Sequence, residues 1–306
     1  MKFHRIIFIF ILVPILGSQL SLQAAELPKD LRVAEEMIRD GLARDAVPRL
    51  RGWLQKNASS PQPEAQVLLA EALLADGRPT EALAALPKST PGDLTHRVLL
   101  VRALALNEAG RWKEALAEWK RIDFTSLPEA QANQARLGLA TAQLNENQRP
   151  EGLKELRQLT EKADVTTAEA ARILLVKTLL ADGKQDEAEK ELNLIQDKAP
   201  ASTRMEARYW KAEITAARGK SEEARELFQK LVEEADGAGR DLLARSWIAI
   251  GRIDRARGKP ADAATALEKA LDRGGDPETY LAAAREYLAA AQASQSLPTA
   301  ALRLRD

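Results

Sequence analysis

Two short stretches of the chain, Ala75–Leu86 (ADGRPTEALAAL) and Ala181–Leu192 (ADGKQDEAEKEL), carry the same pattern. Each begins Ala-Asp-Gly, continues with a basic residue, and then places Glu-Ala four residues ahead of a leucine. The two glycines, Gly77 and Gly183, lie 106 residues apart. That distance is close to three times 36 residues, which predicts further copies of the pattern along the chain.

A similar turn recurs seven times when the chain is aligned on these glycines. We call the aligned residues the turn residues: Gly41, Gly77, Gly110, Asn147, Gly183, Gly219 and Gly258. The intervals between them are 36, 33, 37, 36, 36 and 39 residues, which is typical of stacked repeats. Asparagine replaces glycine once, and it is the other residue that tolerates a left-handed helix end.

Three positions around each turn residue are restricted in size. The residue five positions later is always very small: Ala46, Ala82, Ala115, Gly152, Ala188, Ala224 and Ala263. The residue nine positions later is always large and apolar: Leu50, Leu86, Trp119, Leu156, Leu192, Phe228 and Leu267. The residue seven positions earlier is small or is valine: Ala34, Ala70, Ala103, Ala140, Val176, Ala212 and Gly251. Small residues in both flanking segments predict two helices that cross closely, with the large residue filling the space between units.

This pattern resembles the tetratricopeptide repeat (TPR) family. Trp247 falls on the family's aromatic position early in the first helix, Gly251 on its small position, and Pro200 on its terminal proline. The resemblance covers Leu31 to about Gly275, although no single unit carries every signature residue. It implies an all-α fold: a right-handed α-solenoid of about seven helix-turn-helix units. Pro87 departs from the pattern, and we expect it to end the second helix of its unit early.

The chain divides into four predicted segments. Residues 1–25 form a leader, residues 26–275 the helical repeat solenoid, residues 276–293 a C-terminal capping helix, and residues 294–306 a less ordered tail. The capping helix has an apolar stripe, Tyr280, Leu281, Ala284, Tyr287 and Leu288, and a terminal helix of this kind usually closes a stack of repeats. Homo-oligomerisation through this helix stays open.

The leader has the features of a secretory signal peptide. Lys2 and Arg5 precede eleven apolar residues, Ile6–Leu16, and Ala24 and Ala25 offer a cleavage site. Eleven helical residues span about 16 Å, roughly half the hydrocarbon thickness of a bilayer, so an uncleaved signal anchor is the weaker alternative and we expect no other membrane insertion. The chain has no cysteine, which favours export to a bacterial periplasm or exterior over a disulfide-forming eukaryotic route.

The composition argues against catalysis. His96 is the one histidine after the leader, and with no cysteine the usual zinc ligand sets cannot be assembled. The sequence contains neither a nucleophile elbow nor a P-loop or dinucleotide-binding glycine motif. We therefore expect no enzyme activity, no metal and no cofactor. Without Lys2 and Arg5, 43 basic residues face 45 acidic ones, a net charge of −2 that argues against nucleic acid as a partner.

The resemblance places the partner-binding surface on the first helix of each unit, facing a concave groove. Inward positions would lie ten, six and three residues before each turn residue. The first set is Leu31, Val67, Leu100, Leu137, Ile173, Tyr209 and Ile248, which an ordinary core explains equally well. The second is Glu35, Glu71, Leu104, Thr141, Lys177, Glu213 and Arg252, and the third is Ile38, Leu74, Asn107, Leu144, Leu180, Ala216 and Arg255.

These positions predict an apolar groove, acidic near Glu35 and Glu71 and basic near Arg252 and Arg255, that takes a segment of another protein. The family's clamp for the C-terminal carboxylates of chaperones is not expected, because other residues stand where its key asparagine would be. The sequence therefore predicts a non-catalytic interaction scaffold of the bacterial cell envelope. The alternative is an assembly or accessory factor of a secretion, outer-membrane or cell-wall machine.

Overall fold

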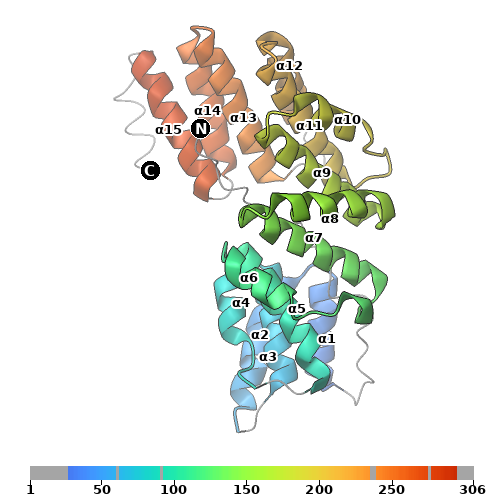
Figure 1. Cartoon of the computed structure of the whole chain (residues 1–306). Coiled ribbons are helices and arrows are strands. Elements are labelled where there is room, and N and C mark those ends of the chain that lie inside the picture. Colours follow the sequence, from blue (N-terminus) through green and yellow to red (C-terminus); the bar gives the residue numbers. More distant parts are fainter. Residues whose placement is uncertain (1–26, 60–61, 90–91, 235–238, 275–276, 295–306) are drawn as a thin grey trace. The chain divides into compact units, whose positions relative to one another are not determined.

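A computed structural model shows an all-α chain (Figure 1). It describes residues 27–59, 62–89, 92–234, 239–274 and 277–294. The predicted leader, residues 1–25, and all of the predicted tail beyond Ser294 lie outside these ranges. No strand occurs within them, so the predicted fold class is confirmed for the part of the chain that is described.

Fourteen of the helices pair into seven hairpins, one around each predicted turn residue. Their bounds are α1 Lys29–Arg39 and α2 Ala43–Lys56; α3 Pro63–Ala75 and α4 Pro79–Ala85; α5 Thr95–Glu108 and α6 Trp112–Trp119; α7 Glu129–Asn145 and α8 Arg149–Lys162; α9 Val165–Ala181 and α10 Gln185–Asn193; α11 Ala201–Ala217 and α12 Ser221–Glu233; α13 Arg240–Ala256 and α14 Pro260–Arg273. The helix α15, Pro277–Ala293, follows them, and short 3₁₀ turns lie at Gly92–Leu94 and Phe124–Ser126.

All seven predicted turn residues adopt a left-handed backbone conformation. Their φ angles lie between 60° at Asn147 and 80° at Gly41. At Gly77 the local bonding shows why: its N–H donates to the carbonyl of Leu74 at 3.0 Å, and Arg78 N–H donates to the carbonyl of Leu73 at 2.8 Å. This pair of bonds satisfies the last carbonyls of α3 and turns the chain toward α4. The repeat register read from the sequence is therefore confirmed.

The size-restricted positions form the contacts between helices. The seven small residues five positions after the turn residues, and the seven residues seven positions before them, are all buried. Gly251 shows the reason for the restriction, because a Cβ there would lie 2.7 Å from Cγ of Leu267 on the second helix of the same hairpin. The early end of the second unit is also found: α4 stops at Ala85, two residues before Pro87.

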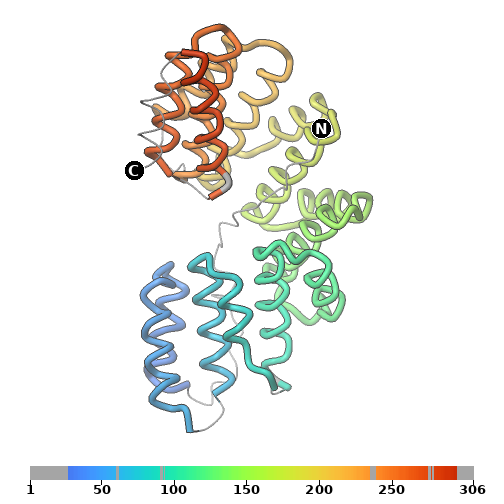
Figure 2. The backbone as a smooth tube through the Cα atoms, turned by 90° about the vertical axis from the view of Figure 1, so that its left-hand side faces the viewer, coloured from blue at the N-terminus to red at the C-terminus, as the bar shows by residue number. Residues whose placement is uncertain are grey.

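The hairpins belong to two compact units, residues 1–167 and 168–306. In the first unit each hairpin packs on the next, and the first helices α1, α3, α5 and α7 contact one another in turn. In the second unit α11, α13 and α15 do the same, and α15 lies beside both α13 and α14. Figure 2 shows the backbone tube reversing its direction between the two helices of a hairpin, most clearly in the blue part of the first unit. None of the helices in the described ranges is both long and apolar enough to cross a membrane.

Candidate partner-binding face of the first helices

The structure separates the predicted groove residues by accessibility. Most of them are buried: Ile38, Glu71, Leu74, Leu104, Asn107, Thr141, Leu144 and Tyr209. Four are half-buried: Glu35, Lys177, Leu180 and Glu213. Only Arg252 and Arg255 keep about half of their side-chain surface exposed, 55% and 42%. The first inward set, from Leu31 to Ile248, is buried throughout, as an ordinary core requires.

Four of the seven residues of the third set, Ile38, Leu74, Asn107 and Leu144, are buried in the interior rather than lining an apolar groove, whereas Leu180 and Ala216 are half-buried and Arg255 is exposed. Leu144 shows this, because its Cγ lies 2.8 Å from the place where a Cβ on Gly152, in the second helix of that hairpin, would stand. Asn107 is also internal: its amide donates to the carbonyl of Gly138 at 2.7 Å and accepts from the Trp119 indole at 3.4 Å. The apolar groove predicted from Ile38, Leu74, Leu144 and Leu180 is therefore corrected for the first three, whose side chains fill the core, and it stays a prediction for the half-buried Leu180.

The two predicted acidic positions of the first unit are neutralised by one arginine. Arg97 on α5 donates two hydrogen bonds to Glu71 on α3, from Nε to Oε1 at 2.5 Å and from Nη2 to Oε2 at 2.6 Å. Its Nη2 also reaches Glu35 on α1 at 3.4 Å. Ion pairs thus connect three successive first helices, α1, α3 and α5. The predicted acidic surface near Glu35 and Glu71 is corrected, because these carboxylates belong to an ion-pair cluster around the buried Arg97.

Burial and charge act in opposite directions on Arg97. Burial lowers the pKa of its guanidinium, but the attraction and hydrogen bonds of Glu71 and then Glu35 outweigh burial, so the pKa is raised overall. The side chain stays charged in the folded protein. A buried carboxylate such as Glu71 would be costly without this partner.

The second unit repeats the arrangement with the charges exchanged. Lys177 on α9 donates to Glu206 on α11, Nζ to Oε1 at 2.9 Å, and Arg245 on α13 reaches the other oxygen of Glu206 at 3.0 Å. The Trp210 indole donates to the same carboxylate at 3.1 Å. Burial raises the pKa of Glu206, but Lys177 and Arg245 outweigh burial and bring it down to about 2.

The cationic groups of Lys177 and Arg245 each lie over an aromatic ring. Lys177 Nζ lies 5.5 Å from the centroid of the Trp210 ring, and the Arg245 guanidinium lies 4.8 Å from that of Tyr209. Both distances suit cation–π attraction. Beside them, burial raises the pKa of the half-buried Glu213, although a hydrogen bond from Tyr209 lowers it in part.

The last part of this face is its most accessible part. Arg252 and Arg255 on α13 share one carboxylate, Glu286 on α15, with Nε to Oε1 at 2.9 Å and Nη2 to Oε2 at 2.9 Å. Two guanidinium groups thus share one carboxylate at the surface, and Arg252 also attracts the half-buried Glu213, which lowers the pKa of that carboxyl in part. We call Arg252 and Arg255 the arginine pair.

The sequence interpretation missed four members of these clusters: Arg97, Glu206, Arg245 and Glu286. A positional signal was available for two of them, because Arg97 and Glu206 each lie thirteen residues before a turn residue. Arg245 lies at the same position, but its ion pairs are with Glu206 and Asp241. Arg97 and Glu206 each form an ion pair with a residue of the preceding first helix, and that residue lies six positions before the turn residue of its own hairpin. The partner is Glu71 for Arg97 and Lys177 for Glu206. Opposite charges at these two positions would have predicted the pairs.

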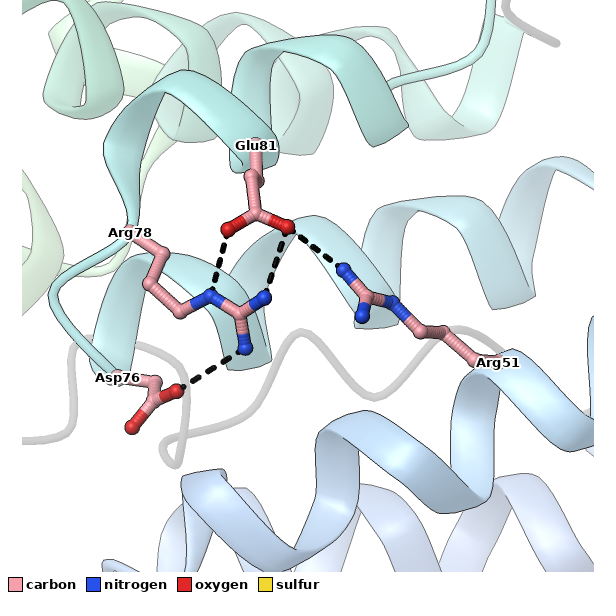
Figure 3. Close-up of polar contacts among 4 residues, drawn as sticks. All are labelled: Arg51, Asp76, Arg78 and Glu81. Carbon is pink, nitrogen blue, oxygen red and sulfur yellow. Dashed lines mark hydrogen bonds and ion pairs between the residues drawn. The ribbon is translucent and has the colours of Figure 1, made fainter.

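The charged residues of the repeated stretch Ala75–Leu86 form ion pairs close to the turn at Gly77. Figure 3 shows Arg78, just after the turn residue, bound to Glu81 through Nε at 2.7 Å, while Arg51 reaches Glu81 from α2 at 2.7 Å. Asp76 lies 3.4 Å from the same guanidinium. Arg111 and Glu114 repeat this pair in the third hairpin at 2.6 Å. These exposed pairs bridge the turn and contribute little stability, so the phrase itself is not a binding site.

Comparisons with known proteins agree with this architecture. Three family models, each described as tetratricopeptide repeat, match residues 34–93, 96–121 and 203–274. A search of curated protein sequences found no match.

Solved structures show the same fold at low sequence identity. A tetratricopeptide repeat protein from Parabacteroides merdae is 17% identical over 85% of this chain and 97% of its own, with a TM-score of 0.59. NprR in complex with its cognate peptide NprX is 14% identical, with 90% and 87% covered and a TM-score of 0.58. A Rap protein complexed with competence and sporulation factor is 12% identical, with 90% and 91% covered and a TM-score of 0.57.

Proposed function

We propose that this chain, which belongs to the tetratricopeptide repeat family, is a non-catalytic scaffold that binds a segment of another protein along its first helices. Repeat solenoids bury most of their apolar surface between units and use the remaining helix faces for recognition. Two fold neighbours, NprR and Rap, were solved with a peptide and with competence and sporulation factor, which supports a similar use here.

The arginine pair is the observation that carries the proposal. It is the accessible end of a face on which Lys177, Glu206 and Arg245 are already paired. A carboxylate from a partner can approach Arg252 and Arg255 without first breaking a buried contact, and it would share them with Glu286. Charge-assisted bonds of arginine to carboxylate are among the stronger polar contacts. The partner segment that suits this site is acidic.

We also propose that the scaffold acts after export, in a bacterial cell envelope. The basic residues Lys2 and Arg5, the apolar run Ile6–Leu16 and the absence of cysteine support this location. Fractionation of cells that produce the full chain should recover a form shortened near Ala25 in the periplasm or medium. Recovery of the full-length chain in the cytoplasm would overturn the location without affecting the binding proposal.

Affinity capture from envelope extracts tests the binding proposal. The wild type is compared with Arg252→Glu/Arg255→Glu, which reverses the charge of the arginine pair. We expect partners that depend on this face to be reduced at least about tenfold, equivalent to a loss of about 1.4 kcal/mol in binding.

The matched control is Lys154→Glu/Arg157→Glu on α8. These two residues are also basic, exposed and three positions apart, but they lie on a second helix. The control should retain the partners. Equal recovery with both variants, or equal loss with both, would refute the arginine pair as the binding site.

A further inference from the structure

The arginine pair is already engaged by a carboxylate of its own chain. Glu286 accepts one bond on each oxygen, from Arg252 Nε and from Arg255 Nη2, both at 2.9 Å. Its side chain is 20% exposed, less than that of either arginine. An acidic partner that reaches the two guanidinium groups therefore meets this carboxylate first.

The packing of α15 keeps Glu286 within reach of the arginine pair. Ala283, Tyr287 and Ala290 form the buried side of α15, which packs against both α13 and α14. The Tyr287 hydroxyl donates to Glu268 of α14 at 2.7 Å. Because Glu286 lies beside this buried side, the helix holds its carboxylate next to α13.

Glu286 takes up one position of the bonding fork on each arginine. An arginine can bind a carboxylate with two parallel bonds, from Nε and Nη2. Arg97 binds Glu71 in this way, and Arg225 binds Asp254 so, with Nε to Oδ1 at 2.7 Å and Nη2 to Oδ2 at 3.0 Å. In the arginine pair Glu286 uses Nε of one fork and Nη2 of the other. A partner's carboxylate can take the whole fork of either arginine only by displacing an oxygen of Glu286.

A second carboxylate, Glu213 on α11, acts on the same site from a neighbouring first helix. Arg252 attracts it and lowers the pKa of its carboxyl in part, although burial raises that pKa overall. Glu213 also accepts a hydrogen bond from Tyr209 of its own helix, whereas Glu286 bonds to both arginines directly. Glu286 is therefore the carboxylate that a partner would replace.

We propose that Glu286 is an internal competitor of the acidic partner and limits how tightly the arginine pair binds it. The inference rests on the proposed function and adds a regulatory contact to the same site. When the partner takes a whole fork, the displaced oxygen of Glu286 turns toward solvent, which already reaches part of this side chain. The affinity of the site then reflects the partner's bonds minus the contact with Glu286 that is lost.

Binding of a model acidic peptide tests this proposal. A fluorescein-labelled hexaglutamate peptide is titrated with the full-length chain, and fluorescence anisotropy gives the Kd. Glu286→Gln keeps the size of the side chain but removes its charge. We expect it to lower the Kd at least about threefold relative to the wild type, because the arginine pair is then released from a competing anion.

The matched control is Glu223→Gln on the second helix α12. It changes the net charge by the same amount and also removes a glutamate from an ion pair, with Lys220 at 3.2 Å. The Kd of this variant should equal that of the wild type. Equal tightening by both variants would assign the effect to overall charge and would overturn the proposal.

Glu286→Asp separates the lost charge from altered packing of α15. This variant keeps a carboxylate on the helix, so its Kd should lie closer to that of the wild type than to that of Glu286→Gln. Equal tightening by the aspartate and glutamine variants would show that a disturbed α15 is the cause, and would also overturn the proposal.

Arg252→Glu/Arg255→Glu distinguishes failure of this inference from failure of the proposed function. If that variant loses the peptide while Glu286→Gln binds it no more tightly than the wild type, Glu286 is not a competitor and the binding site stands. If that variant binds the peptide as well as the wild type does, the arginine pair is not the site. Failure of Glu286→Gln to bind the peptide would overturn both.

Discussion

Glu71 and Lys177 lie six residues before a turn residue, where the repeat pattern predicts a charge that faces a partner. In the structure each is held by a side chain of the next first helix, Arg97 or Glu206. The polar character of these positions therefore serves to align successive hairpins. Spacing alone identified the positions, but it could not show that the charge opposite was within reach, because that depends on how closely the hairpins stack.

Removing one partner of such a buried pair should be costly. Glu71→Ala leaves the Arg97 guanidinium buried with only the longer contact to Glu35, so we expect the free energy of unfolding to fall by about 3–5 kcal/mol. Glu36→Ala, at an exposed position on α1, should change it by less than about 0.5 kcal/mol. Urea denaturation measures both. Similar losses from the two variants would show that the Arg97–Glu71 contact adds nothing to stability.

Glu108 should make stability depend on pH. Burial raises the pKa of its carboxyl from the ordinary 4.5 to about 7 in the folded protein. Between these values the folded state binds more protons than the unfolded chain, so the stabilising contribution is complete below pH 4.5 and is lost as the pH rises through 7.

Glu108→Gln should remove that dependence. It should raise the free energy of unfolding at pH 8 by on the order of 1–3 kcal/mol and change it little at pH 4.5, where the wild-type carboxyl is protonated when folded. Urea denaturation at the two pH values provides the measurement. The same gain at both would mean that ionisation of Glu108 is not the cause.

At the scale of helices, the sequence predicted most of what is found. The seven turn residues, the small crossing positions and the early end at Pro87 follow from local backbone and size requirements, and these are visible in one sequence. The sequence did not predict in the same way which side of each first helix stays exposed to solvent. The spacing in the sequence places Leu74 and Leu144 on the same helical face as charged residues. In the structure both leucines are buried, and Leu144 lies against the second helix of its hairpin.

Close contact between helices yields a pair of opposite predictions for two helical glycines. A Cβ on Gly138 of α7 would lie 2.5 Å from Cζ2 of the Trp119 indole, whereas nothing lies within 4 Å of the corresponding point on Gly52 of α2. Gly138→Ala should therefore lower the free energy of unfolding by about 1–3 kcal/mol. Gly52→Ala should raise it by roughly 0.5–1 kcal/mol, because alanine favours the helix. Thermal or urea unfolding that gave the same sign for both would contradict the packing at α6 and α7.

At the scale of the whole molecule, two compact units present first-helix faces of different character. In the first unit the predicted acidic positions form ion pairs with the buried Arg97. In the second unit the arginine pair on α13 stays accessible to solvent. The all-α repeat fold follows from the sequence. The proposal that the second unit is the binding region does not follow from the sequence, because it depends on which charges are paired inside each unit.

Photo-crosslinking in living cells tests the central claim most directly. A photoreactive amino acid, p-benzoylphenylalanine, is placed at Arg255 on the first helix α13, and separately at the exposed Arg157 on the second helix α8. We expect crosslinks to another protein from position 255 and none from position 157. Crosslinks from position 157 alone, or from neither position while affinity capture still recovers the partner, would contradict recognition by the first helices.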